Sequence, residues 1–185
     1  MRRWAAIAGA AALWAGATGA AGADQFDSTP LFAAGRWSVE HTYDAAARGS
    51  WCAADTVNAE GQWLSVVGYD TGAAAILVGD PEWRMREGAV RFRIDVDRTG
   101  WDVEGTGSDG SVAVFLDDAV AAADFLAGLT EGAEAAVYSD AGRRLAAFPL
   151  DGASRAIEEL VRCWNRIELP DPFATATVAP PGMGL

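Results

Sequence analysis

The chain of 185 residues contains no lysine, so all fourteen of its basic residues are arginines. Acidic residues outnumber them at 26, and the formal net charge at pH 7 is −12. A protein with this balance repels nucleic acid and anionic lipid, so we expect neither as a partner. The missing lysine bears on solubility and not on the fold.

Histidine and cysteine are nearly absent as well. His41 is the single histidine, and Cys52 and Cys163 are the two cysteines. Two distant cysteines and one imidazole do not make up a metal-ligand set, so we expect no metal and no cofactor.

Long apolar runs are missing after residue 23, so no later segment is expected to cross a bilayer. Before that point, Arg2 and Arg3 precede an apolar stretch, and Ala21-Gly22-Ala23 has the small-x-small pattern of a signal-peptidase site. We therefore predict a signal peptide over residues 1–23 and a periplasmic or secreted bacterial protein. An uncleaved N-terminal anchor is the alternative.

Export changes the interpretation of the two cysteines. Oxidising compartments pair such thiols, so we predict a disulfide between Cys52 and Cys163. This bond closes a loop of about 110 residues, for which chain entropy predicts roughly 4–5 kcal/mol of stability. Two buried free thiols are the alternative.

The remaining composition indicates one folded domain. The chain is 51% hydrophobic, which excludes a disordered protein, and its length fits a single domain. We expect an N-terminal linker over residues 24–35, a β-rich domain over residues 36–168 and a Pro/Gly-rich flexible tail over residues 169–185.

Apolar and polar residues alternate in short segments separated by turn residues, which is typical of half-buried antiparallel strands. The clearest segment is 89–96, where Val90, Phe92, Ile94 and Val96 point to one face and arginines and aspartates to the other. We expect strands over residues 36–43, 62–69, 73–78, 89–96, 100–104, 111–116, 134–139 and 143–148.

Two helices are expected between and after these strands. Asp117 or Asp118 can cap a helix that runs to about Leu129. Residues 154–165 carry apolar side chains at helical spacing, so this second helix is expected to dock on the sheet. The predicted fold is α+β and β-rich: about eight antiparallel, sandwich-like strands, with a helix before the last hairpin and a C-terminal helix packed on the sheet.

Motifs with a chemical meaning are weak. Residues 105–110 match the G-x-G-x-x-G of dinucleotide loops, but a strand pattern follows where a helix is needed, so we interpret them as a hairpin turn. Asp95, Asp97 and Gly100 match the start of a calcium loop. Its twelfth position holds Thr106 in place of a bidentate glutamate, so we expect a turn here too.

A serine–histidine–aspartate triad would have to use His41 with Ser38, Ser50 or Ser65. No Gly-x-Ser-x-Gly nucleophile elbow occurs. His41 recurs at every second position with Trp37 and Val39, so we expect a histidine packed on the same strand face as these residues. The abundant carboxylates leave sugar cleavage by a carboxylate pair open without pointing to one. We predict no catalytic residue.

Tryptophan is in excess, with eight residues in the chain. Trp37, Trp63 and Trp101 lie in strand patterns and are expected in the core. Trp83 follows a proline turn and is a candidate contact for a glycan or for a groove of another protein.

The stretch from Phe148 to Cys163 resembles the ending of exported bacterial proteins of the invasion-associated locus B family. It has an apolar strand, a Leu-x-Gly-small turn and a helix that ends in cysteine. Trp37-x-Val39, and Pro81-x-Trp83 ahead of Arg91, are similar to that family too. A related C-terminal pattern occurs in exported proteins associated with type VI secretion. The resemblance implies a periplasmic β-rich domain with no established catalysis, and it transfers no functional residue.

We therefore expect an exported, non-enzymatic interaction domain similar to the invasion-associated locus B proteins. Its expected partner is another envelope protein or cell-wall glycan, and the candidate ligand contacts are Trp83 and His41. The alternatives are a small cell-wall-directed hydrolase that uses His41 and a glycan-binding module that uses Trp83.

Overall fold

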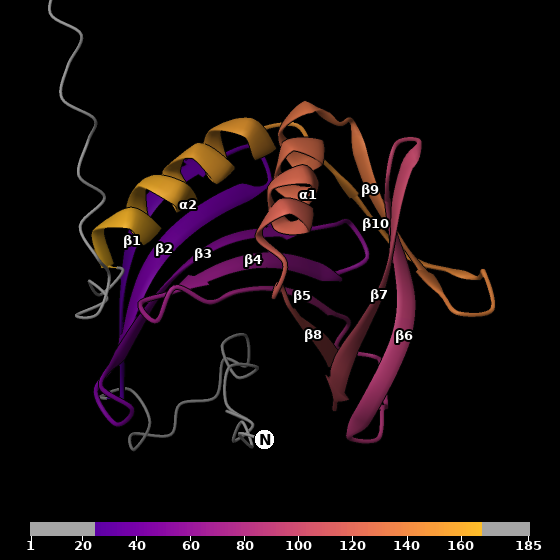
Figure 1. Ribbon diagram of the computed structural model, residues 1–185, viewed down its shortest axis with the longest axis horizontal. Coiled ribbons are helices and arrows are strands. Elements are labelled where there is room, and N and C mark those ends of the chain that lie inside the picture. Colours follow the sequence, from indigo (N-terminus) through magenta and orange to yellow (C-terminus); the bar gives the residue numbers. More distant parts are fainter. Residues whose placement is uncertain (1–24, 168–185) are drawn as a thin grey trace, which may run out of the picture.

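The computed structural model describes residues 25–167; the predicted signal peptide and the predicted tail at 169–185 lie outside the described residues. Ten antiparallel strands form one continuous sheet in the order β1-β2-β3-β4-β5-β8-β7-β6-β9-β10 (Figure 1). The strands are β1 (Phe26–Ala34), β2 (Trp37–Asp44), β3 (Gly49–Val57), β4 (Trp63–Tyr69), β5 (Ala74–Gly79), β6 (Gly88–Val96), β7 (Thr99–Ser108), β8 (Ser111–Phe115), β9 (Glu134–Ser139) and β10 (Arg144–Pro149). The helices are α1 (Ala119–Glu131) and α2 (Ala153–Ile167).

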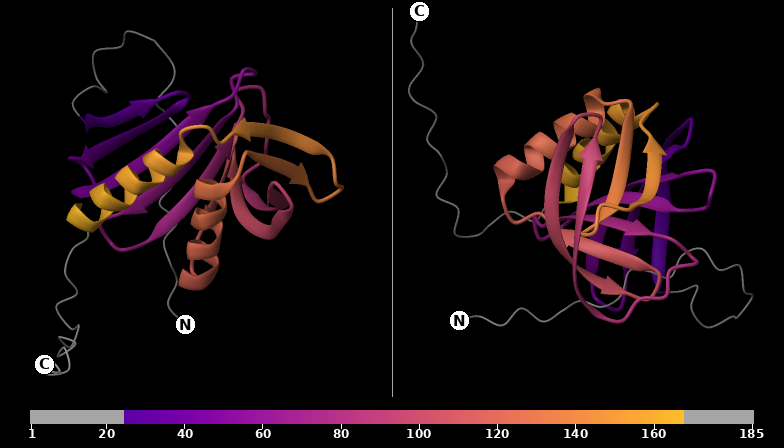
Figure 2. Two further views of the ribbon diagram at one scale, coloured as in Figure 1. Left: turned by 90° about the horizontal axis from the view of Figure 1, so that it is seen from above. Right: turned by 90° about the vertical axis from the view of Figure 1, so that its right-hand side faces the viewer.

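The sheet is strongly curled, and both helices lie in its hollow (Figure 1 and Figure 2). α2 packs across β1 to β4, while α1 lies beside α2 and reaches β6 and β7. The hollow is therefore the main core, which includes the almost fully buried side chains of Trp37, Leu64, Ile94, Phe148 and Leu160. We call this the inner face of the sheet and the opposite side the outer face.

α2 docks on the inner face through a stripe of buried residues that recur every three or four positions, namely Ala153, Ala156, Ile157, Leu160 and Cys163. This confirms the docking predicted from the sequence. Next to the stripe, the Trp164 ring lies over Gly68, where a Cβ atom would come within 2.5 Å of the ring. Glycine at this position lets the helix approach β4 closely.

α1 begins where the sequence predicts. Asp118 is its N-cap, and its Oδ1 accepts hydrogen bonds from the backbone N–H of Val120 at 2.8 Å and of Ala121 at 3.1 Å. The ring of Phe125 meets Trp101 of β7 edge-on, with 5.3 Å between ring centroids. Neither described helix is both long and apolar enough to span a membrane.

The expected linker over residues 24–35 is wrong, because residues 26–34 form the edge strand β1, which pairs with β2. Pro30 suits an edge strand because it lacks a backbone N–H, and the register shifts between Pro30 and Phe32 as at a bulge. No strand pattern was recognised over β3, the strand that carries Cys52, since it is covered on both faces and shows no alternation. The sheet thus has ten strands, and its β-rich architecture with two helices is confirmed.

Both motif-like stretches belong to β-hairpins, but the turns are shorter than predicted, at residues 97–98 and 109–110, and the other motif residues lie in the strands β6 and β7. Residues 105–110 run from β7 into its hairpin with β8, where Gly110 has a φ of +81°. Asp97 lies at the β6–β7 turn, and its carboxylate accepts hydrogen bonds from the backbone N–H of Ala133 and Glu134 at 3.1–3.2 Å. Asp97 of the apparent calcium loop therefore fixes the start of β9 through these hydrogen bonds.

Side chains of the β3–β4 turn connect this part of the curled sheet to its edge strand β10. Asn58 Nδ2 donates to the carbonyl of Ala147 at 3.1 Å, and Gln62 Nε2 donates to the carbonyl of Leu145 at 2.9 Å. Both carbonyls belong to β10, the strand at the far edge. The amides thus satisfy part of an edge that would otherwise lie open.

Candidate binding site

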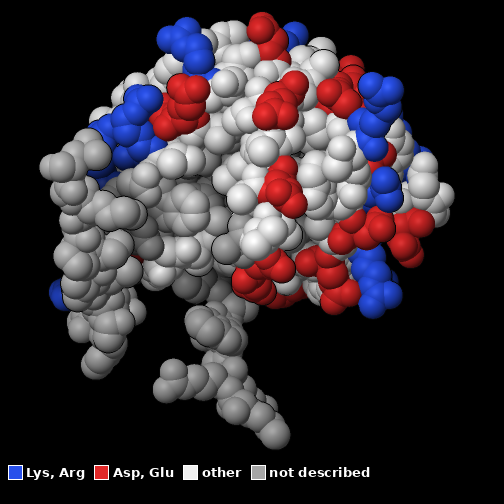
Figure 3. Space-filling view, turned by 45° about the horizontal axis from the view of Figure 1, so that its top comes forward, with Lys and Arg blue, Asp and Glu red and all other residues white. Residues whose placement is uncertain are grey.

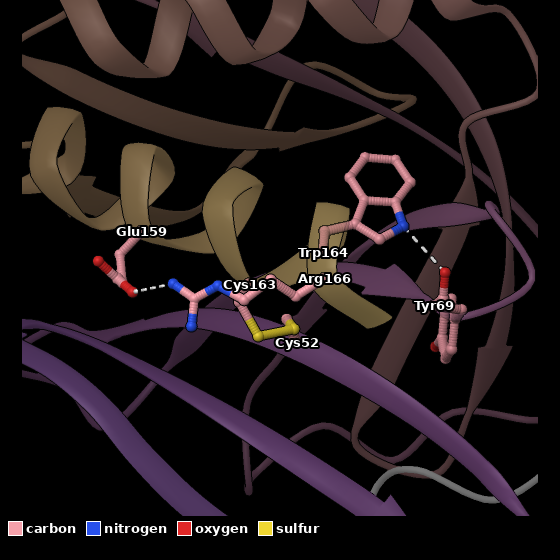
Figure 4. The surroundings of a disulfide bond; sticks show 6 residues. All are labelled: Cys52, Tyr69, Glu159, Cys163, Trp164 and Arg166. Atoms are coloured by element: carbon pink, nitrogen blue, oxygen red, sulfur yellow. Dashed lines mark hydrogen bonds and ion pairs between the residues drawn. A yellow bond between two sulfur atoms is a disulfide. The ribbon is translucent and has the colours of Figure 1, made fainter. Parts of the chain in front are cut away.

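The predicted disulfide is present and joins β3 to α2 (Figure 4). Cys52 and Cys163 are 111 residues apart in sequence and 6.1 Å apart between their Cα atoms, and both are buried. Beside them, Trp164 Nε1 donates to the carbonyl of Tyr69 at 2.9 Å. A buried bond of this kind is compatible with an oxidising, exported location.

His41, the only candidate base of a triad, lies on the inner face of β2 directly opposite Cys52. It is half-buried, and its Nε2 finds no hydrogen-bond partner among the described residues. Ser38 and Ser65 point to the outer face, so the structure does not bring them to His41. Ser50 shares the face of His41, but no hydrogen bond joins the two side chains in the described chain.

Trp83, the candidate glycan contact, is half-buried between β5 and β6 and packs against the main core. Of the expected core tryptophans, Trp37 is fully buried, whereas Trp63 and Trp101 are partly exposed. Trp63 lies on the outer face, where its ring covers Gly79.

The outer face of β3, β4 and β5 carries a second apolar cluster made of Ala53, Val67, Ala75 and Leu77, flanked by Trp51, Trp63 and Tyr69. At its margin, Phe115 of β8 stacks on Tyr69 with 6.3 Å between ring centroids. Phe115 keeps 53% of its surface exposed, which is unusual for a phenylalanine on a sheet. Burial raises the pKa of Tyr69.

Next to this apolar cluster, on the same face of β3, the carboxyl group of Asp55 has a strongly raised pKa. Burial raises its pKa from the ordinary 3.8 to about 6; a hydrogen bond with Ser65 works against this rise, and the nearby charge of Glu40 adds to it. Asp55 therefore stands on the outer face as a carboxyl group whose pKa is about 6.

Charged side chains line a shallow groove of about 430 Å³ on the outer face of β6, β7 and β9. Arg91 Nε donates to Glu104 Oε2 at 2.8 Å. Arg93 Nε donates to Asp95 Oδ1 at 2.5 Å, and its Nη1 lies 3.6 Å from Asp102 Oδ1. These carboxylates raise the pKa of both arginines. Because each guanidinium already faces a carboxylate, the groove is not a ready site for an anion.

A second groove of about 420 Å³ lies next to the first one, on the outer face of β6, β7 and β8. Small residues, among them Ala89 and Ala113, form part of its wall, and Glu87, Glu104, Asp117 and the exposed Phe115 line it. We call it the acidic groove.

The sequence predicted only part of these surfaces. Alternation in β6 indicated that Arg91, Arg93 and Asp95 share a face, and the structure places all three in the first groove. Glu104 and Phe115 were missed as site residues, because their role depends on which strands become neighbours in the sheet. A phenylalanine at the polar position of a strand pattern is the signal that was available.

Within residues 25–167, no group of three or more histidine, cysteine, aspartate or glutamate side chains is arranged to hold a metal ion. Comparisons with models of known protein families, with curated proteins and with solved structures return no match to this chain.

Proposed function

We propose that this protein is an exported, non-enzymatic interaction domain similar to the invasion-associated locus B proteins, and that it binds another protein of the bacterial envelope. The observation that carries the proposal is the buried Cys52–Cys163 bond, which ties the last helix to an early strand. Such a bond persists in an oxidising compartment and is rare in a reducing one.

The outer face of the sheet supports the binding role. Two adjoining grooves of about 430 and 420 Å³ lie on it, and both are open and carry charged side chains. One exposed aromatic ring, that of Phe115, stands among them. A partly apolar surface with a charged rim is typical of a surface that recognises another protein.

Export and thiol pairing are tested together in a Gram-negative host that expresses the full chain. We expect the protein in the periplasmic fraction, with no thiol alkylated unless a reductant is added first, as measured by intact mass. A chain without residues 1–23 is the control and is expected to stay in the cytoplasm. Two free thiols in the periplasmic protein would overturn the proposal.

The non-enzymatic part is tested with the purified protein in a broad hydrolase screen that includes peptidoglycan. We expect no turnover of any substrate. Turnover that disappears in His41→Ala, at an unchanged melting temperature, would replace the proposal with the hydrolase alternative.

A further inference from the structure

The acidic groove leaves a large apolar side chain in water. Phe115 exposes 53% of its surface, and its ring stacks at an angle of 30° on that of Tyr69, with 6.3 Å between the ring centroids. Covering such a ring stabilises a complex by about 25 cal/mol for each Å² that leaves water. The groove thus offers an anchoring point for an apolar side chain of a partner.

All the charged residues that line the groove are acidic. Glu87, Glu104 and Asp117 line the groove, and no arginine is among its lining residues. Glu104 pairs with Arg91 on the side of the neighbouring groove, whereas Glu87 and Asp117 take part in no ion pair within residues 25–167. α1, which begins beside the groove, carries no basic residue. On the face of the molecule drawn in Figure 3, Asp and Glu side chains lie among uncharged ones, with Arg side chains toward both sides of the view.

These charges favour one class of occupant. A second copy of this chain would bring the same carboxylates face to face in a symmetric contact, which is unfavourable. Anionic lipid and nucleic acid are repelled for the same reason. A protein segment with arginine or lysine on both sides of an aliphatic residue complements the ring and the rim together.

We infer that the acidic groove is the docking site for a basic segment of a partner protein, with an aliphatic side chain of that segment resting on Phe115. The inference builds on the proposed interaction function and specifies the chemistry of the partner. Cationic side chains of the segment pair with Glu87 and Asp117.

The test is an NMR titration of the ¹⁵N-labelled domain with the peptide acetyl-Gly-Arg-Leu-Arg-Leu-Arg-Gly-amide. We expect the largest shift changes at Thr106, Ala113 and Phe115, and an affinity that falls as salt is added. A peptide with glutamate in place of arginine is the matched probe and is expected not to bind. Equal binding of the two peptides, or shift changes confined to other faces, would overturn the inference.

Variants locate the binding on the groove. Phe115→Ala is expected to weaken binding about tenfold, since most of the apolar contact is lost. Glu87→Gln combined with Asp117→Asn is expected to weaken it about threefold to tenfold. Val161→Ala and Glu158→Gln, on the exposed side of α2, are the matched controls and should leave the affinity unchanged. Unchanged affinity in all groove variants contradicts the inference.

The two proposals fail in different ways. If the groove variants bind as well as the native chain while export and thiol pairing hold, the inference is wrong and the interaction function stands. If the thiols are free in the periplasmic protein, the proposed function is wrong whatever the peptide does.

Discussion

The two helices of this protein lie in the same hollow but are held in different ways. α2 is fastened to β3 by a disulfide and to β4 by the Trp164 indole, and it buries a full apolar stripe. α1 has its cap at Asp118, the burial of Phe125 and Leu129 and its contacts with α2, without a covalent link to the sheet. The half of the sheet under α2 is therefore tied covalently to its helix. The half beside α1, which borders the acidic groove, is held by hydrogen bonds and packing without a covalent link, and we expect it to open at lower free energy.

The largest effect on stability is expected from removing the Cys52–Cys163 disulfide, which fastens α2 but not α1. Replacing both cysteines (Cys52→Ala and Cys163→Ala) should lower the free energy of unfolding by about 4–5 kcal/mol, because the unfolded chain regains the freedom of a long loop. Chemical denaturation measures the loss, with the reduced native chain as control. Equal denaturation midpoints for the variant and the native disulfide-bonded chain would show that the disulfide is not what holds α2 more firmly than α1.

A cavity under α1 tests the other side of the comparison. Phe125→Ala removes a buried ring that meets Trp101 and should cost about 3–4 kcal/mol. Leu160→Ala in α2 is the matched variant. Hydrogen exchange should show α1 opening in the first variant, while α2 keeps more of its protection in the second because the disulfide holds it. An equal loss of hydrogen-exchange protection in the mutated helix of each variant would contradict the comparison.

On the outer face of the half that α2 covers, Asp55 makes the free energy of unfolding depend on pH. The pKa of Asp55 is raised to about 6 in the fold, so folded protein holds this proton more tightly than unfolded chain. The stability that Asp55 contributes is complete below pH 3.8 and is lost as the pH rises through 6, by up to about 3 kcal/mol. Asp55→Asn should therefore be more stable than the native chain at pH 8 and equal to it at pH 3.5.

Denaturation at the two pH values measures this difference. Glu158→Gln, on the exposed side of α2, is the control and should follow the native chain. A variant Asp55→Asn whose stability changes with pH as much as that of the native chain would exclude burial of this carboxyl group as the cause.

The contact that joins the two halves is expected to matter less. Asn58 is buried and hydrogen-bonds both to Gln62 and to the carbonyl of Ala147. Asn58→Ala leaves those partners unsatisfied and should cost about 2 kcal/mol. Hydrogen exchange at β10 should rise more than at β3; Glu60→Ala, in the same turn but exposed, is the control. A rise confined to β3 would mean that the amide does not hold the far edge.

The smallest effect concerns the start of α1. Asp118→Ala removes the acceptor of two backbone N–H groups and should lower stability by about 1 kcal/mol. Asp117→Ala, one residue earlier and outside the cap, should stay within about 0.5 kcal/mol of the native chain. Thermal denaturation resolves the two, and equal losses would argue against Asp118 as the N-cap.

How far the sequence could predict the fold depended on the environment of each strand. β6 is covered on one face, so Phe92 and Ile94 alternate with charged residues and the strand is recognisable. β3 is covered on both faces and contains alanines in place of β-branched residues, so its sequence resembles neither strand nor helix. β1 has a proline and polar residues because it is an edge.

The sequence by itself determined the features that depend on local spacing or on residue type. These are the β4–β5 and β9–β10 hairpins, a helix cap at Asp117 or Asp118, the apolar stripe of α2 and the pairing of the only two cysteines. Each follows from neighbouring residues or from elimination, so no knowledge of distant contacts is needed.

Only the tertiary structure decided where the candidate binding surface lies. Glu104 meets Arg91 because β7 pairs with β6, and Phe115 meets Tyr69 because β8 is inserted beside β5. The order of strands in a sheet is set by the burial of the whole core and not by any one segment. The acidic groove is thus a property of the assembled sheet, which alternation within single strands does not encode.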